Sequence, residues 1–407
     1  MNVLLVTDAY RPLRTSAANQ IYDLAQAFAK AGHEVSIIIP TSKQSQPVIF
    51  TRQEGIELVR VKAWQTKDVN YLRRIFAEWI NPIVMWHRLR TNQIFTTRQY
   101  QGIIWYSPSI FWGPLIASLK KHFKSPSYLI LRDIFPDWAL DLGLIKPGLL
   151  YQFFMWAQHN QNCQANVIGL QSPNNLTYFR MRNSTLEAKL EVLWNWAEKI
   201  PESACTIDFS QTKLAGRKIF VYAGNMGLAQ GMETLIEFVG VMKQDRRVGF
   251  AFVGRGSEVE RLKKLVVSMN LDNALFFDEI DPSQIPGLYR QCFFGLITLD
   301  RRHSTHNIPG KFLSYLQAGL PVIAFVNPGN DLIDLIADHQ LGQCFINEDL
   351  ASIPGQIEVI CKQYQADLGL AERCRQVNKQ YFAASSACNL ITKALQDLSF
   401  SKSNQDR

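Results

Sequence analysis

The chain has 407 residues, of which 47% are hydrophobic and 19% charged, a composition typical of a globular protein with two or three domains. This balance excludes a largely disordered chain, and no stretch approaches the ~18 uninterrupted apolar residues of a membrane-spanning helix. Asp8 and Arg11 interrupt the apolar N-terminus too early for a signal peptide, and the seven cysteines form no C-x-x-C pair. We therefore expect a cytoplasmic protein with reduced thiols.

The formal net charge of +8 is concentrated in the first half of the chain. Residues 1–200 contain 22 of the 43 basic residues and only 13 of the 35 acidic ones. This excess predicts an anionic partner for the first half, and a solvated basic face that only favours solubility is the alternative.

The first half alternates between strand and helix patterns. Residues 2–6 are an apolar run, and after a loop through Thr15 the apolar residues 21, 24, 25 and 28 share one helical face. Gly32 ends this helix and 35–40 is the next strand, so the unit predicts parallel strands. The same alternation continues with strands at 58–61, 102–106, 128–131 and 167–171 and helices near 71–91, 109–123 and 148–164.

The pattern begins again at Lys218 and predicts a second sheet of the same kind. Its strands are expected near 218–223, 248–253, 274–277, 294–298 and 321–326, with helices near 231–243, 256–269, 283–291, 310–318 and 330–337. The polar segment 197–216 predicts a linker between a domain at 1–196 and a domain at 217–383, and 349–399 is helical. The predicted class is α/β, with two doubly wound parallel sheets whose carboxyl ends face a common cleft.

Two loops of the second half have the composition of phosphate-binding loops. Residues 218–227 run from a buried strand into the glycine turn of Gly224, Asn225, Met226 and Gly227, and helical periodicity follows from residue 230. Glycine lets the backbone approach a ligand, and a helix start offers unpaired N–H groups. A second loop, 306–311, ends in Lys311 at another helix start. The helix dipole disfavours a cation there, which favours an anionic ligand over a merely solvated lysine.

At this point a resemblance to a known family becomes visible. The runs 222–231 (YAGNMGLAQG), 252–256 (FVGRG) and 309–323 resemble retaining glycosyltransferases of family 4. Residues 131–137 (LRDIFPD) resemble the branch that builds bacterial O-antigen, capsule and exopolysaccharide, including N-acetylfucosaminyltransferases. The resemblance extends from Val3 to about Ile391. It implies a GT-B fold in which the domain at 1–196 holds the acceptor, the domain at 217–383 holds a nucleotide-sugar, and the last helix, about 384–400, packs back on the first domain.

The resemblance also implies sugar transfer with retention of anomeric configuration, without a bound metal or other cofactor. The chain contains no D-x-D triplet, which metal-dependent sugar transferases use. Fixed positive charge at the departing diphosphate is then the main catalytic requirement.

Candidate site residues follow from the two loops and from the resemblance. The candidate catalytic residues are Arg132, Asp133 and Lys311. The candidate donor-binding residues are Gly224, Asn225, Met226, Gly227, Arg255, Ile280, His306, Ile308, Pro309, Gly310, Lys311 and Ser314. The candidate acceptor-side residues are Thr15, Ser16, Ala17, Asn19 and Trp112.

The chain departs from the family pattern at several of these positions. His306 and Ser314 stand where the family often has two glutamates separated by seven residues, and Asn225 and Gln230 replace its usual arginine and lysine. Ser16 and Ala17 replace a glycine pair. The segment 105–112, rich in aromatic residues, is expected to form part of the acceptor-side surface.

Residues 71–98 combine basic and aromatic side chains. The arginines are Arg73, Arg74, Arg88, Arg90 and Arg98, interleaved with Tyr71, Phe76, Trp79, Trp86 and Phe95. This mixture predicts an anionic membrane surface as partner, while an amphipathic core helix with a cationic outer face is the alternative. No nucleic-acid-binding module accompanies it, so no nucleic-acid partner is expected.

The sequence therefore predicts a bacterial transferase that moves a sugar from a nucleoside-diphosphate donor, UDP-linked by resemblance, to a lipid-linked saccharide. It would be attached peripherally to the inner face of the cytoplasmic membrane. One alternative is a nucleotide-sugar 2-epimerase, which would turn over its donor without acceptor lipid. The other is a non-catalytic, membrane-bound partner of another transferase, because the missing glutamates and basic residues are compatible with lost catalysis.

Overall fold

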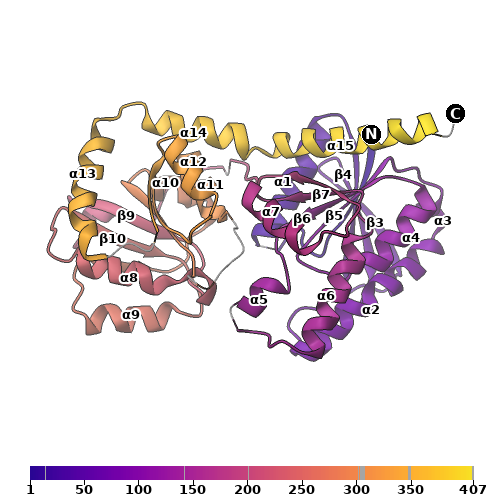
Figure 1. Ribbon diagram of the computed structural model, residues 1–407, viewed down its shortest axis with the longest axis horizontal. Helices are drawn as coiled ribbons and strands as arrows, with labels where there is room; N and C mark the ends of the chain where they lie inside the picture. Colours follow the sequence, from indigo (N-terminus) through magenta and orange to yellow (C-terminus); the bar gives the residue numbers. More distant parts are fainter. Residues whose placement is uncertain are drawn as a thin grey trace. The chain divides into compact units, whose positions relative to one another are not determined.

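The computed structural model of the chain describes residues 1–13, 15–141, 143–199, 201–300, 302, 308–346 and 350–405 (Figure 1). It divides into two compact units, one formed by Met1–Trp196 with Ala384–Arg407 and the other by Ala197–Ala383. None of the helices in the described part of the chain has the length and apolar character needed to span a bilayer.

The first unit is built on an eight-stranded sheet with the order β3-β4-β2-β1-β5-β6-β7-β8. Its strands are β1 (Asn2–Val6), β2 (Glu34–Thr41), β3 (Val48–Gln53), β4 (Ile56–Lys62), β5 (Gly102–Tyr106), β6 (Ser127–Leu131), β7 (Val167–Leu170) and β8 (Lys189–Val192). Every pairing is parallel except β3 with β4, which form an antiparallel hairpin. The sequence did not predict β3 or β8. Both are edge strands with only one buried residue or none, so neither has the apolar run that marks an internal strand.

Helices cover both faces of this sheet (Figure 1). They are α1 (Ser16–Lys30), α2 (Tyr71–Arg90), α3 (Gln93–Thr96), α4 (Gly113–Phe123), α5 (Asp137–Asp141), α6 (Leu149–Asn162), α7 (Pro173–Arg182) and α15 (Ala384–Gln405). On one face, Leu24 and Phe28 of α1 share a buried cluster with Ile391 and Leu395 of α15. On the other face, α2 and α4 pack over a second cluster. The doubly wound arrangement places the loops after the strands at one edge of the sheet.

The second unit contains a six-stranded, fully parallel sheet with the order β11-β10-β9-β12-β13-β14. Its strands are β9 (Lys218–Ala223), β10 (Val248–Val253), β11 (Ala274–Phe277), β12 (Phe294–Thr298), β13 (Val322–Phe325) and β14 (Gly342–Phe345). Its helices are α8 (Met232–Val241), α9 (Val259–Ser268), α10 (Ile285–Tyr289), α11 (Gly310–Ala318), α12 (Leu332–Asp338), α13 (Ile353–Ala366) and α14 (Leu370–Tyr381). The predicted α/β class with two parallel, doubly wound sheets is confirmed, although the short edge strand β14 was missed.

The segment 197–216 differs from the loose linker that its polar composition predicted. It packs on the second unit, where Phe209 and Leu214 are buried. The Phe209 N–H donates to Gln291 Oε1 at 3.1 Å, and the Ala197 N–H donates to the Phe382 carbonyl at 3.1 Å. Two apolar anchors and backbone hydrogen bonds thus hold a segment that has no helical or strand periodicity.

Helix α15 is held in the first unit by apolar contacts that are far apart in sequence. Leu395 is fully buried, and a Cβ atom placed on Gly102 would lie 2.6 Å from Leu395 Cδ1. We expect Leu395→Ala to lower the free energy of unfolding by about 2–5 kcal/mol, because it leaves a cavity against β5. Urea unfolding measures this. Leu368→Ala, at a leucine that is 96% exposed, is the control and should change stability by less than about 0.5 kcal/mol; equal losses would contradict the packing.

Candidate functional site

The turns after β9 and β10 contact each other through their backbones. Gly224 N–H donates to the Val253 carbonyl at 2.9 Å, and Met226 N–H donates to the Arg255 carbonyl at 2.8 Å. A Cβ atom on Gly254 (φ +143°) would lie 2.2 Å from Gly224 O, and one on Gly256 (φ +155°) would lie 2.1 Å from Met226 O. Glycine is therefore required here both by backbone conformation and by space. The two turns form a closely fitted backbone pair at the carboxyl ends of two neighbouring strands.

The first turn does not lead directly into a helix, as the sequence had predicted. A short 3-10 turn, Leu228–Gln230, and Gly231 (φ +58°) separate it from α8. Gln230 Oε1 accepts hydrogen bonds from the Gly227 N–H at 2.9 Å and from Asn225 Nδ2 at 3.2 Å. The helix-start N–H groups thus belong to Met232 onward, and the Gly227 N–H is capped by a side chain that a phosphate would have to displace.

Lys311 and the glycine turn, predicted separately, meet in the structure. Lys311 Nζ donates to Tyr222 Oη at 3.0 Å and lies 4.4 Å from the centre of that ring. The Tyr222 hydroxyl in turn donates to the Asn225 carbonyl at 2.8 Å, and a Cβ atom on Gly224 would lie 3.9 Å from Lys311 Cε. Burial lowers the pKa of Lys311 to about 8 because the charged form loses water. A cation is therefore held beside the backbone of the turn by a neutral hydroxyl.

Tyr222 and Tyr315 are site residues that sequence reasoning missed. Both are fully buried, and in the sequence each has the appearance of an ordinary core residue. Tyr315 Oη accepts from the Ala223 N–H at 3.2 Å and lies 3.1 and 3.2 Å from its acceptors, the Val221 and Leu296 carbonyls. Its hydroxyl ties α11 to β9 and β12. The signal that could have found them is the phenol itself, since buried tyrosine hydroxyls need partners.

The remaining predicted donor residues have varied environments. Ser314 Oγ lies 3.2 Å from the carbonyls of both Gly310 and Lys311, so it hydrogen-bonds its own helix. Arg255 is 72% exposed and pairs with Glu279 at 3.3 Å. Ile308 is buried, Pro309 precedes the first residue of α11, Gly310, and Ile280 is half-buried in the loop after β11. His306, with its neighbours Arg301 and His303, lies outside the described residues.

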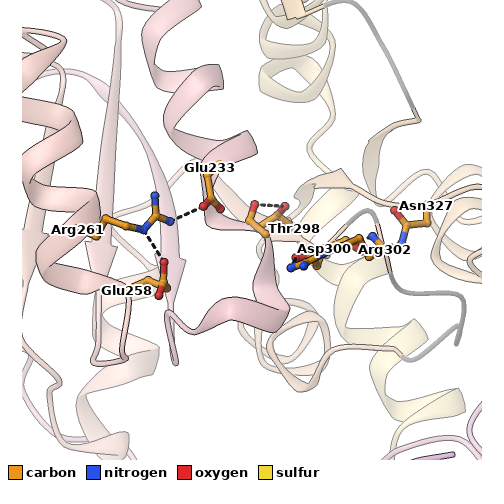
Figure 2. Close-up of polar contacts among 8 residues, drawn as sticks. Glu233, Glu258, Arg261, Thr298, Asp300, Arg302 and Asn327 are labelled. Atoms are coloured by element: carbon orange, nitrogen blue, oxygen red, sulfur yellow. Dashed lines mark hydrogen bonds and ion pairs between the residues drawn. The ribbon is translucent and has the colours of Figure 1, made fainter. Parts of the chain in front are cut away.

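Further charged residues follow β9, β10 and β12 in the chain, and Figure 2 shows their polar contacts. Arg261 bridges Glu233 and Glu258 on neighbouring helices. Asp300, after β12, binds the Arg302 guanidinium through both carboxylate oxygens at 2.9 and 2.7 Å, and its carbonyl accepts from Asn327 Nδ2 at 2.9 Å. These carboxylates are compensated by arginine. Within the described residues, no group of three His, Cys, Asp or Glu side chains could hold a metal ion.

In the first unit, Arg132 lies in a buried polar network. Its side chain is 4% exposed, Nη1 donates to the Leu193 carbonyl at 2.9 Å, and the guanidinium lies 4.4 Å from the Trp196 ring centre. Burial lowers the pKa of Arg132 to about 10. The Arg132 side chain therefore anchors the segment after β8, and little of its charge is exposed to solvent.

Two carboxylates follow strands at the same edge of this sheet. Asp133 comes after β6 and Asp8 after β1, and burial raises the pKa of both side chains. Lys67 and Arg74 oppose that rise at Asp8 through their charge. Asp8 was not predicted as a site residue. The sequence does place it just after the first strand, and α/β proteins bind ligands at such strand ends.

The predicted acceptor-side residues separate into two groups. Thr15 caps α1 by accepting from the Ala18 N–H at 3.2 Å, Ser16 and Asn19 are exposed, and Ala17 is half-buried. Trp112 is 3% exposed, and its backbone N–H donates to Gln161 Oε1 at 3.0 Å. The prediction of an aromatic surface over 105–112 is therefore wrong for Trp112 and for the fully buried Trp105, because they fill the core beneath α4.

The arginines of 71–98 do not share one face. Arg98 pairs with Glu57, and Arg88 donates to the Lys62 carbonyl, so both are bound to the sheet. Arg73, Arg74 and Arg90 are exposed. Exposed apolar side chains accompany them at Tyr71, Leu72, Phe76 and Trp79.

Comparison with known proteins finds a family match in the second unit. Residues 205–380 match the family described as glycosyl transferases group 1. This match lies within the second unit. A relative along most of the chain is WcaI of Escherichia coli K12, provisionally named a colanic acid biosynthesis glycosyl transferase, with 24% identity over 365 residues, 84% of this chain and 85% of that protein. Another is the alpha-monoglucosyldiacylglycerol synthase of Streptococcus pneumoniae R6, with 22% identity over 377 residues, 86% and 77% of the two chains.

Solved structures of the same fold align along nearly the whole chain. Sucrose-phosphate synthase from Thermosynechococcus elongatus aligns with a TM-score of 0.72 at 14% identity, covering 98% of this chain and 99% of that one. HepE of Anabaena, solved with UDP and glucose, aligns with a TM-score of 0.65 at 14% identity, covering 97% and 99%. The predicted GT-B fold is confirmed. Membership of family 4 and retention stay predictions.

The backbone pair of the two glycine turns gives a first test. We expect Gly254→Ala to weaken UDP binding at least tenfold, because its methyl group would force the turn after β9 away from Lys311. The control is Gly216→Ala, where φ is +75° but no atom lies within 4 Å of the new methyl group. Calorimetry on both folded variants measures the difference. Equal binding by the two would show that the turns are not part of the site.

Lys311 gives a second test through its pKa. With a pKa of about 8, the ammonium is present at pH 7 and lost as pH rises, so UDP affinity should fall between pH 7 and 9.5, approaching tenfold per pH unit. Lys311→Met should weaken binding about 10- to 150-fold at pH 7 and remove this pH dependence. Lys264→Met, at an exposed lysine of α9, is the control. A pH dependence that survives in Lys311→Met would assign it to another group.

Proposed function

We propose that this protein is a glycosyltransferase that moves a sugar from a nucleoside-diphosphate donor to a lipid-linked saccharide in bacterial surface polysaccharide synthesis. The observation that carries the proposal is the Lys311–Tyr222 pair beside the glycine turn, within the residues that match group 1 glycosyl transferases. The departing nucleoside diphosphate gains negative charge in the transition state, and a partly buried ammonium stabilises that charge more strongly than one in water. The name of WcaI and the UDP and glucose bound by HepE agree with this chemistry.

The donor would be held by the second unit. The Lys311 ammonium donates to the diphosphate, while Tyr222 fixes the direction of the lysine side chain. A phosphate oxygen that displaces the Gln230 amide would gain the Gly227 N–H as a further donor. We propose a UDP-linked donor and a reaction that needs no metal ion, since these groups supply the electrostatic stabilisation.

The acceptor would be held by the first unit, at the strand ends that carry Asp8 and Asp133. A carboxylate there can orient the attacking hydroxyl and stabilise positive charge on the sugar. A raised pKa makes either group a better proton acceptor than an exposed aspartate. Arg132 is proposed to act at the same edge, where its guanidinium is held by the Leu193 carbonyl and lies over the Trp196 ring. We propose that transfer retains the anomeric configuration.

The proposal is tested by incubating the protein with native membranes and a panel of nucleotide-sugars, followed by mass analysis of the extracted lipids. We expect one donor to add its sugar to a lipid, with the rate unchanged in excess EDTA and with a retained anomer by NMR. Asp8→Asn should lower kcat. Donor conversion without any acceptor would instead indicate an epimerase, and no reaction with any donor would indicate a non-catalytic partner.

The proposed site of action is the inner face of the cytoplasmic membrane, with the protein bound peripherally through the first turns of α2. Arg73 and Arg74 lie there beside exposed Tyr71, Leu72 and Phe76. Each basic side chain near an anionic surface contributes about 1 kcal/mol, and aromatic rings settle at headgroup depth.

Membrane binding should depend on those arginines. Changing Arg73 and Arg74 of the first turn, together with the exposed Arg90 at the other end of α2, to Gln should reduce co-sedimentation with anionic vesicles and its salt dependence. The control changes Arg246, Arg290 and Arg375, exposed arginines of the second unit, in the same way. If both triple variants sediment like the wild type, or none binds at low salt, the membrane assignment fails.

A further inference from the structure

A cavity of about 220 Å³ lies in the first unit among α2, α4 and α6. Its apolar lining includes Trp79, Ile110, Phe111, Pro114, Ala117 and Trp156. Pockets that enclose a whole drug-sized ligand measure roughly 300–1,000 Å³, so this cavity suits one segment of a longer apolar molecule.

The cavity lies next to the edge of the sheet that carries the acceptor-side carboxylates. Ile110 and Phe111 belong to the loop after β5, and Gly113, also in the lining, begins α4. β5 pairs directly with β1, which ends just before Asp8. A ligand segment in the cavity would therefore belong to a molecule whose other end is within reach of that edge.

A row of aromatic side chains connects the cavity with the start of α2. The ring centres of Trp64 and Phe76 are 5.6 Å apart, those of Phe76 and Trp79 6.3 Å, and those of Trp79 and Phe153 6.1 Å. Phe153 stacks on Trp156 at 6.0 Å. The four rings other than Phe153 are 39–55% exposed. A continuous exposed apolar row of this kind marks a binding surface.

Positive charge is placed at the other end of this row. Lys67 and Arg73 are exposed and lie three positions from Trp64 and Phe76 in the chain. Arg74 pairs with Glu78 at 2.7 Å and, with Lys67, acts electrostatically on Asp8. The surface thus has cations at one end, aromatic rings along its length and an apolar cavity at the other end. This order matches an amphiphile with an anionic head and a hydrocarbon chain.

We propose that the cavity binds a segment of the hydrocarbon chain of the lipid-linked acceptor, with its anionic head at Lys67, Arg73 and Arg74. The proposal rests on the proposed function, because that function supplies the lipid-linked acceptor. It adds that the protein recognises the lipid itself and does not only approach the membrane that contains it.

The binding test uses octyl, decyl and dodecyl phosphate below their micellar concentrations, with inorganic phosphate as reference. Each methylene that enters the cavity should raise affinity about fourfold until the cavity is filled. Ala117→Phe should abolish this chain-length dependence by filling the cavity, whereas Ser118→Phe, at the next residue but outside the lining, should keep it. Affinity that does not depend on chain length, or an equal dependence in both variants, overturns the proposal. Trp156→Ala, at a side chain that is 55% exposed, replaces Ala117→Phe if that variant does not fold, and should reduce the dependence.

The activity test distinguishes the acceptor from bilayer lipid as the occupant. In detergent, Ala117→Phe should raise KM at least tenfold for an acceptor with a long chain and leave both kcat and the KM of a short-chain analogue unchanged. If Ala117→Phe weakens only vesicle binding, the occupant is bilayer lipid and the proposal is wrong. If no acceptor is turned over but the alkyl phosphate series behaves as expected, the proposed function fails while the hydrocarbon site stands.

Discussion

The proposed donor-side site depends on the close approach of two backbone turns. Because the carbonyls of Gly224 and Met226 occupy the space where side chains on Gly254 and Gly256 would lie, the turns after β9 and β10 cannot move independently. Their position fixes the Asn225 carbonyl, that carbonyl accepts from Tyr222, and Tyr222 accepts from Lys311. A steric constraint between two pairs of glycines and carbonyls therefore determines where a cation from a helix 89 residues away is held.

The chemical partner of that cation matters as much as its position. A buried lysine beside a carboxylate would be neutralised, and an anionic ligand would then compete with an internal charge. The acidic side chains drawn in Figure 2 are instead compensated by other residues, Glu233 by Arg261 and Asp300 by Arg302. Lys311 has a neutral phenol as its partner, and burial lowers its pKa. An anionic ligand would then stabilise the charged form of Lys311, which burial alone disfavours.

Sequence reasoning recovered the parts of this architecture that depend on local pattern. Apolar runs predicted the internal strands. The glycine turn and Lys311 were predicted as parts of one donor site, and the structure brings the two together. What it missed depends on contacts between distant residues. Gln230 was interpreted only as the replacement of a lysine that is usual in the family, although its amide caps the turn. Trp112 read as a surface aromatic because composition cannot distinguish an exposed ring from one beneath a helix. Arg88 and Arg98 contributed to the predicted basic surface, although both are bound to the sheet.

The first unit resolves its excess of positive charge in a different way. Some arginines hydrogen-bond the sheet and serve its stability. Lys67 and Arg74 instead lie within electrostatic range of Asp8. An aspartate with a raised pKa repels an approaching diphosphate less than an ordinary carboxylate does, because its protonation costs less free energy. The same property suits a group that accepts a proton from an attacking hydroxyl. In the proposed reaction this edge would admit an anionic acceptor and activate its hydroxyl, and half-buried carboxylates flanked by cations suit that task better than exposed acids of ordinary pKa.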